Sequence, residues 1–211
     1  MCIHRIADNT NNMTLSELYS LIRWDLRINA GLSWDSVRAM LLLVELRCEQ
    51  FVYSKTQNGG ILKIFWFLMR GFGSIFQWFI CNSNIPGSTT IGRGLRLPHP
   101  QNIIVAAFAD IGEFCTIYHN VSIAWNGFKP TVPHSPTIGA RTLLGAGAII
   151  IGDIDIGTNV LIGAGAVVSK SIPDNSTVTS MRPEIRERLP SEDAAQPGSA
   201  RHLTDPYSIW R

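Results

Sequence analysis

The sequence predicts a mainly β protein, in which a coiled solenoid of short parallel strands follows a small N-terminal α-helical region. Apolar residues recur at strict six-residue intervals in the second half of the chain: Ile138, Leu144, Ile150, Ile156, Ile162 and Val168. Small residues share this phase, because glycine directly follows four of these anchors. Strands alternate with period two and helices with period 3.6, so a six-residue period indicates a prism of three flat walls with the anchors inside.

The same phase extends the predicted solenoid toward the N-terminus. It starts with Ile91 and Leu97 and continues, after a slip of two residues, at Val105, Ile111, Ile117 and Ile123. Residues 124–137 interrupt the pattern. We therefore expect a domain of hexapeptide repeats over residues 84–180, with a loop leaving the prism near its middle.

Residues 1–83 form the predicted helical region. Thr14 and Glu17 have the spacing of a capping box, and apolar residues then recur at helical intervals. A second helix is expected from Ser33 to Glu49. Residues 61–80 are rich in Phe, Trp, Ile and Leu but are interrupted by polar residues and glycines. We interpret this segment as a helix packed on the first coil or on a partner subunit, with a peripheral membrane contact as the alternative.

Composition limits the partners and the compartment. A net charge of +2 without a basic run argues against a nucleic-acid partner. The four cysteines are scattered without a C-x-x-C pair, which indicates reduced thiols rather than a zinc knuckle or a disulfide framework. Polar residues stand where a signal peptide would be apolar, so we expect a cytoplasmic protein. Residues 181–211 are rich in polar residues and proline, and a loose C-terminal extension is expected there.

Three histidines in the repeat region are candidates for chemistry. His99 and His119 each follow a core anchor by two positions, where a side chain should leave the core at a corner of the prism. Because their anchors are one coil apart, the two histidines should stack on the same edge, about 5 Å apart in strand spacing. His134 belongs to the interrupting loop, and active sites favour such loops.

Two stretches of the solenoid carry a specific motif. The first runs Thr90-Ile91-Gly92-Arg93-Gly94-Leu95-Arg96-Leu97-Pro98-His99 and is followed by Ile103-Ile104-Val105. The second includes Leu144-Gly145-Ala146-Gly147-Ala148, Ile162-Gly163-Ala164-Gly165-Ala166 and Ile172-Pro173. These residues resemble the serine acetyltransferase family, and the short helical N-terminus is closer to its members in exopolysaccharide and colanic acid clusters. The resemblance implies a left-handed parallel β-helix, whereas the general rule for parallel crossovers would predict right-handed turns.

By this resemblance the chain would transfer an acetyl group from acetyl-CoA to a hydroxyl, with His99 as the general base. A neutral imidazole suits this role near pH 7. His134 is the family's candidate oxyanion donor, and Ser135 competes for that position. Asn84 stands where the family carries an acidic residue that orients the base, so we expect Asn84 to be a weaker partner.

The acceptor and the donor site are implied in the same way. Pro98 replaces an aspartate that helps the serine-specific enzymes to bind their amino acid, which favours a sugar or exopolysaccharide precursor over L-serine. His119 and Trp125 are candidates to line the acceptor site. The candidates for binding CoA are Gly145, Ala146, Gly163, Ala164, Lys170 and Arg182. A homotrimer or a dimer of trimers is implied, and no metal is expected.

Two other functional classes stay open. A catalytically silent hexapeptide scaffold is favoured by Asn84 and by the aromatic segment 61–80. A zinc-dependent, carbonic anhydrase-like hexapeptide protein would need two histidines five residues apart, and the sequence contains no such pair in its repeats. An assay for thiol release from acetyl-CoA separates an enzyme from a scaffold, and metal analysis tests the zinc alternative.

Overall fold

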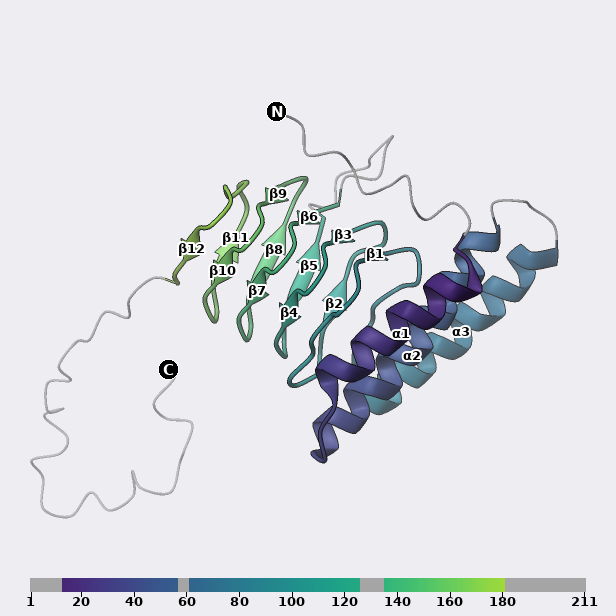
Figure 1. Ribbon diagram of the computed structural model, residues 1–211. Helices are drawn as coiled ribbons and strands as arrows, with labels where there is room; N and C mark the ends of the chain where they lie inside the picture. Colours follow the sequence, from purple (N-terminus) through teal and green to yellow (C-terminus); the bar gives the residue numbers. More distant parts are fainter. Residues whose placement is uncertain (1–12, 57–60, 126–134, 181–211) are drawn as a thin grey trace, which may run out of the picture. The chain divides into compact units, whose positions relative to one another are not determined.

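The computed structural model describes residues 13–56, 61–125 and 135–180, and Figure 1 shows their arrangement. Three helices come first: α1 (Leu15–Asn29), α2 (Trp34–Lys55) and α3 (Ile61–Cys81). Short strands follow, and every pair between them is parallel. The predicted fold class, a strand solenoid with a small N-terminal helical region, is therefore confirmed for these residues.

The strands form three four-stranded walls. The first wall contains β1 (Thr90–Ile91), β3 (Asp110–Ile111), β6 (Thr137–Ile138) and β9 (Asp155–Ile156). The second wall contains β4 (Thr116–Ile117), β7 (Leu143–Leu144), β10 (Leu161–Ile162) and β12 (Thr177–Val178). The third wall contains β2 (Ile104–Val105), β5 (Ser122–Ala124), β8 (Ile149–Ile151) and β11 (Val167–Val168). The chain visits the walls in rotation, so each of the inner coils adds one strand to every wall, whereas the first coil meets the second wall only through the bridge of Arg96 with Thr116.

The six-residue anchors fill the interior of this prism. Those of the second half, from Ile138 to Val168, are each at most 4% exposed. The earlier anchors Val105, Ile111, Ile117 and Ile123 are buried in the same way. The hexapeptide period is therefore the pattern of one continuous core, because every sixth side chain points inward from the next wall.

Helices α1 and α2 begin where the sequence predicts. The Thr14 hydroxyl accepts a hydrogen bond from the Glu17 N–H, while the Glu17 carboxylate accepts one from the Thr14 N–H, which completes the capping box. Ser33 caps α2 by accepting a hydrogen bond from the Ser36 N–H. Helix α2 continues to Lys55, beyond the predicted Glu49, since no helix breaker intervenes.

A buried polar network joins α1 and α2 to the first coil. The Asp25 carboxylate on α1 accepts hydrogen bonds from the Arg47 Nε on α2, at 2.8 Å, and from the backbone N–H groups of Gly94 and Leu95. The Arg47 guanidinium also donates to two carbonyl oxygens at and just after β1 (Ile91 and Gly92). Both charged side chains are at most 1% exposed, and their full set of partners offsets the cost of burial. The network fixes α2 in position beside the first coil.

Helix α3 covers residues 61–80, where the sequence predicts a helix. It packs mainly against α2, and its Arg70 also contacts Asn84 of the first coil. A Cβ at Gly73 would collide with the Glu45 carboxylate, so this glycine leaves room for that side chain between α2 and α3. By compactness the chain divides after Ser180, which places the helices and the β-helix in one unit. The looseness expected for 181–211 concerns residues outside the described ranges.

Candidate active site

His99 lies at the corner between the second and third walls. Leu97 fills the core, and the following turn carries the His99 side chain outward, where it is 51% exposed. Its Nδ1 lies 2.7 Å from Oδ2 of Asp35, a residue in the first turn of α2. The prism therefore supplies the imidazole, and the helical region supplies a carboxylate that holds it.

Several local features hold the Asp35 carboxylate in place. A carboxylate in the first turn of a helix is favoured by the helix dipole. The second oxygen of Asp35, Oδ1, accepts a hydrogen bond of 2.8 Å from the Gln101 amide, which comes from the same turn as His99. The hydrogen bond with His99 holds the pKa of Asp35 below its ordinary value, so this carboxylate is ionised at neutral pH.

This pairing defines what the imidazole can do. An ionised carboxylate only accepts hydrogen bonds, so Nδ1 of His99 carries the proton and donates it to Asp35. The Nε2 atom of a neutral ring is then free to accept a proton from a substrate. Asp35 also stabilises the imidazolium that forms when Nε2 accepts that proton. The pair has the composition and geometry of a general base with its orienting carboxylate.

The structure corrects the partner that the sequence suggests for His99. Asn84 pairs with Ile104 on the third wall, and its Oδ1 accepts a hydrogen bond of 2.6 Å from Arg70 on α3. Asn84 thus belongs to the contact between α3 and the first coil, because Arg70 occupies its side-chain oxygen. The family carries an acidic residue at the position of Asn84. In this chain the carboxylate that contacts His99 comes instead from Asp35 on α2.

His119 lies beside His99 on the same corner, as the repeat register predicts. Their ring centroids are 5.7 Å apart, with the planes nearly perpendicular. Nδ1 of His119 is buried and has no hydrogen-bond partner among the described residues. An unpaired buried nitrogen is costly unless a further group reaches it, so His119 is available to a ligand or to a neighbouring side chain.

The same corner continues through the later coils. Parallel pairing aligns Arg96 with Thr116, Thr116 with Leu143, and Leu143 with Leu161. The residue three places after each of these occupies the equivalent corner position: His99, His119, Ala146 and Ala164. The two histidines are therefore followed along one edge by two residues with a methyl side chain, which leaves the backbone there accessible to an extended ligand.

The glycines before these alanines have a mainly structural role. A Cβ at Gly145 would come within 2.7 Å of the Ala164 backbone nitrogen in the next coil, and one at Gly163 within 3.1 Å of the Val178 oxygen. Close stacking of the coils accounts for glycine at both positions. Lys170 is exposed but follows β11, so it lies at the next corner of the prism.

The other predicted residues are placed only in part. Trp125 is 39% exposed and ends the described segment after β5. Ser135, the competitor for the oxyanion position, donates a hydrogen bond from its hydroxyl to the Ala107 carbonyl oxygen. His134 and Arg182 lie outside the described residues. Within the described ranges no group of three His, Cys, Asp or Glu side chains could hold a metal ion.

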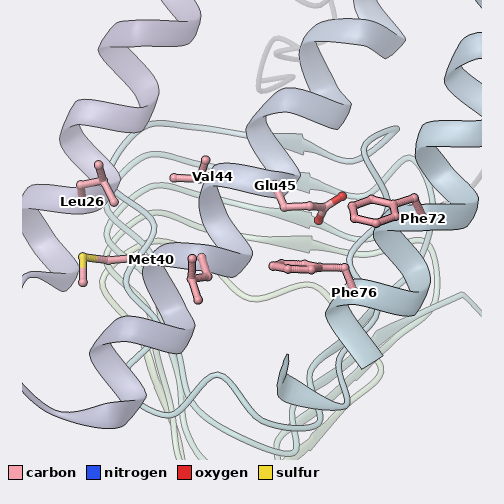
Figure 2. Close-up of a pocket in the computed structure, with 7 residues that line it drawn as sticks. Leu26, Met40, Val44, Glu45, Phe72 and Phe76 are labelled. Carbon is pink, nitrogen blue, oxygen red and sulfur yellow. The ribbon is translucent and has the colours of Figure 1, made fainter. Parts of the chain in front are cut away.

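Two clefts lie near the helices. An apolar hollow of about 350 Å³ between the three helices is lined by Leu26, Met40, Leu41, Val44, Glu45, Phe72 and Phe76, and Figure 2 shows the Glu45 side chain pointing toward Phe72. A second cleft of about 450 Å³ is lined by Ile75 and Trp78 of α3, by Ile104, and by asparagines that include Asn84 and Asn102. His99 lines neither of them, because it projects from a convex corner.

Comparisons with known proteins agree with this geometry. Residues 135–170 match the family described as bacterial transferase hexapeptide (six repeats). A serine acetyltransferase of Helicobacter pylori is 36% identical over 118 residues, which are 56% of this chain and 68% of that protein. The chain belongs to the serine acetyltransferase family.

Solved serine acetyltransferases share the fold. The soybean apoenzyme is 26% identical with a TM-score of 0.64, over 76% of this chain and 65% of the soybean chain. A serine acetyltransferase in complex with CoA is 19% identical with a TM-score of 0.62, over 77% of this chain and 66% of that one. The predicted left-handed β-helix is confirmed, and the chain spans less than two thirds of the length of the soybean member.

Asp35 and Gln101 are the site residues of this serine acetyltransferase family member that sequence reasoning missed. Asp35 follows the capping residue Ser33 by two positions, so a sequence pattern does place it in the first turn of a helix. Nothing in that pattern indicates that the helix begins beside His99. Gln101 was easier to find than Asp35, because it stands two residues after His99 in the same turn. An amide at that place can donate a hydrogen bond to a carboxylate that pairs with the histidine.

Proposed function

We propose that this chain is an acetyl-CoA-dependent O-acetyltransferase in which His99, held by Asp35, is the general base. The observation that carries the proposal is the 2.7 Å contact between the His99 Nδ1 and the Asp35 carboxylate. The family supports acetyl transfer, since its members carry the name serine acetyltransferase. Asn84 was one of the two grounds for a silent scaffold, beside the aromatic segment 61–80. The contact with Asp35 weakens that ground, because it gives His99 a carboxylate partner.

In the proposed reaction the acceptor hydroxyl attacks the thioester carbonyl of acetyl-CoA. Nε2 of His99 takes the hydroxyl proton as the new C–O bond forms, and Asp35 stabilises the resulting imidazolium. The C–S bond then breaks, and the departing thiolate of CoA takes the proton from His99. His134 or Ser135 is the proposed donor to the oxyanion between these two steps.

The proposed donor site runs along the corner that carries the two histidines. Ala146 and Ala164 follow His119 at equivalent positions, and their small side chains let an extended pantetheine chain approach the backbone. Lys170, at the neighbouring corner of the prism, and Arg182 are the proposed partners of the CoA phosphates. One solved family member is a complex with CoA, which supports a CoA site in this fold.

The acceptor is L-serine or, as we propose, a sugar or exopolysaccharide precursor. The names of the relatives favour L-serine. Pro98 cannot pair with the ammonium group of an amino acid, and both oxygens of Asp35 already accept hydrogen bonds from His99 and Gln101. A sugar hydroxyl needs no such ammonium partner. His119 and Trp125 are the proposed acceptor contacts, and the likeness of the N-terminus to exopolysaccharide enzymes points the same way.

Assembly into a homotrimer or a dimer of trimers is part of the proposal. His99 projects from a convex corner rather than into a cleft, and a substrate site needs walls on several sides. A neighbouring subunit would supply the missing wall. Sedimentation should therefore find active protein only as an oligomer, and an active monomer would contradict this.

The location that we propose is the cytoplasm, where acetyl-CoA is available to a soluble family member. The proposed peripheral membrane contact through residues 61–80 depends on α3 alone and is independent of the transfer chemistry.

The test of the proposed function is release of the CoA thiol by purified protein. Acetyl-CoA is supplied with L-serine in one series and with neutral monosaccharides and oligosaccharides in another. Acceptor-dependent thiol release with any of them supports the enzyme, and the acceptor that gives the highest kcat/KM identifies the class. No release above the rate of acetyl-CoA hydrolysis with all acceptors would contradict the proposal.

A further inference from the structure

Helix α3 directs Arg70 and Gln77 toward the protein. Arg70 donates a hydrogen bond to Asn84 and lies 3.6 Å from the Glu49 carboxylate. Gln77 is fully buried, and its amide bonds with the Glu45 carboxylate and with both backbone polar groups of Ile85. The hydrophilic side of α3 is therefore its packed side.

The opposite side of α3 is apolar and exposed. We define the α3 apolar face as Ile61, Phe65, Leu68, Phe72, Ile75 and Phe79, whose side chains follow one another at intervals of three or four residues. Each of them is at least 50% exposed. This is the reverse of an ordinary surface helix, which turns its apolar stripe inward, and contiguous apolar patches of this kind mark interaction sites.

The flanks of this face show which partner it suits. Positions beside the stripe carry Leu62, Ile64, Met69, Gly71, Phe76 and Trp78. In a helix pair formed with another protein, such flanking positions usually carry charged residues that set partner and register. Here they are apolar, so the apolar band is wider than the seam that a second helix would cover.

The charges of α3 also suit a membrane surface. The charged residues of α3 are Lys63 and Arg70, both cations, and the helix contains no Asp or Glu. The nearest carboxylates, Glu45 and Glu49, lie on the packed side of α3. Nothing on the apolar face would repel the anionic headgroups of a bilayer. Lys63 lies on the same side of the helix as Arg70, but it is exposed in the first turn of α3, where its long side chain can extend past the helix end toward the headgroups.

The hydrogen bonds of α3 decide how it would meet a bilayer. By length and composition Ile61–Cys81 could cross a membrane, with a mean hydropathy of 1.3 over its most apolar window. Crossing would separate Arg70 and Gln77 from Asn84, Glu45 and Ile85 and leave their polar groups in hydrocarbon. A helix lying in the plane of the interface keeps all of these bonds.

We propose that the α3 apolar face docks this protein on an anionic membrane surface, with α3 parallel to the bilayer. The contact is peripheral and reversible, because one side of a single helix enters the lipid. The apolar hollow beside α3, which Phe72 and Phe76 share with Met40 and Val44 of α2, continues the apolar surface toward α2 (Figure 2).

The test is flotation of the purified full-length protein with lipid vesicles. Vesicles of phosphatidylcholine alone are compared with vesicles that also contain phosphatidylglycerol. We expect binding to both and tighter binding to the anionic ones. The double variant Leu68→Ser, Ile75→Ser should weaken binding by about tenfold or more, because both side chains enter the lipid.

A matched control comes from α1. Leu15 and Tyr19 are 72% and 68% exposed, close to the 65% and 62% of Leu68 and Ile75, and the double variant Leu15→Ser, Tyr19→Ser should bind vesicles like the wild type. Circular dichroism checks that both variants are folded.

Absence of vesicle binding by the wild-type protein would overturn the proposal. If sedimentation then shows that Leu68→Ser, Ile75→Ser lowers the oligomer mass, the α3 apolar face is an interface with a second copy. Acetyl transfer is assayed on the same preparations without vesicles, so failure of membrane docking does not count against the proposed enzyme.

Discussion

The Asp35 carboxylate lies 2.7 Å from the His99 imidazole, although 64 positions separate the two residues in the chain. One belongs to the first turn of α2 and the other to a corner of the first coil. The contact joins the helical region to the β-helix at the point where the proposed chemistry occurs.

The first prediction concerns His99 as the base. His99→Ala should lower kcat by roughly 10²–10⁴, the usual contribution of a positioned general base. The side chain is half exposed and fills no core, so the melting temperature and acetyl-CoA binding should change little. Steady-state kinetics and calorimetry measure these quantities. If His99→Ala keeps normal turnover while His119→Ala loses it, the base is the histidine of the next coil.

The second prediction concerns Asp35. Asp35→Asn keeps a hydrogen-bond partner for the ring but removes the charge that stabilises the imidazolium, so kcat should fall by about tenfold or more. Because the pKa of Asp35 is lowered, its charge is present at neutral pH and is lost only as the pH falls through that lowered value. The loss of activity should therefore be seen across the whole neutral range in a pH profile of kcat.

Asn84→Asp is the matched control for that variant. A carboxylate at position 84 would lie beside Arg70 rather than His99, so kcat should stay level. A fall in kcat of more than about tenfold, or 1.4 kcal/mol, would mean that Asn84 contributes to catalysis in a way that the Arg70 contact does not explain.

The third prediction concerns the buried pair of Asp25 and Arg47. Asp25→Ala leaves the Arg47 charge buried without its partner and two backbone N–H groups of the first coil unpaired. The free energy of unfolding should fall by about 3–5 kcal/mol. Denaturant titration measures the loss, with Glu17→Ala at the exposed end of α1 as a milder comparison. An effect no larger than that of Glu17→Ala would show that the network does not hold the helices on the coil.

The fourth prediction concerns Glu45, whose pKa burial raises above the ordinary value of 4.5. The folded state therefore favours the protonated form, and burial of the charge costs stability as the pH rises above that ordinary value. Glu45→Gln keeps an oxygen for the Gln77 amide and removes the charge. It should stabilise the protein at pH 7 by about 1 kcal/mol, or about 2–4 °C in melting temperature.

The pH dependence of the stability gained by Glu45→Gln tests whether the buried charge is its cause. The gain should shrink as the pH falls toward 4.5, because Glu45 is then protonated in the wild type as well. A destabilised Glu45→Gln variant at neutral pH would mean that the charge is needed, for example through its attraction to Arg70.

The solenoid of parallel strands and the positions of His99 and His119 on it could be predicted from the sequence alone. The anchors from Ile138 to Val168 repeat every six residues, and contacts in such a solenoid join equivalent positions of successive coils. The period therefore determined that His119 stacks beside His99, before any tertiary contact was known. The capping box of Thr14 and Glu17 could also be predicted, because its hydrogen bonds join residues only three positions apart.

Only the tertiary structure decided which residue completes the site and which side of α3 is exposed. The docking of α2 depends on hydrogen bonds from Asp25 and Arg47 to backbone groups, and every sequence offers such groups. The partner of His99 is thus Asp35 rather than Asn84, which no periodicity could indicate. Likewise, an apolar segment such as 61–80 is expected to turn its apolar side inward, but the hydrogen bonds of Arg70 and of the buried Gln77 to neighbouring elements turn that side outward.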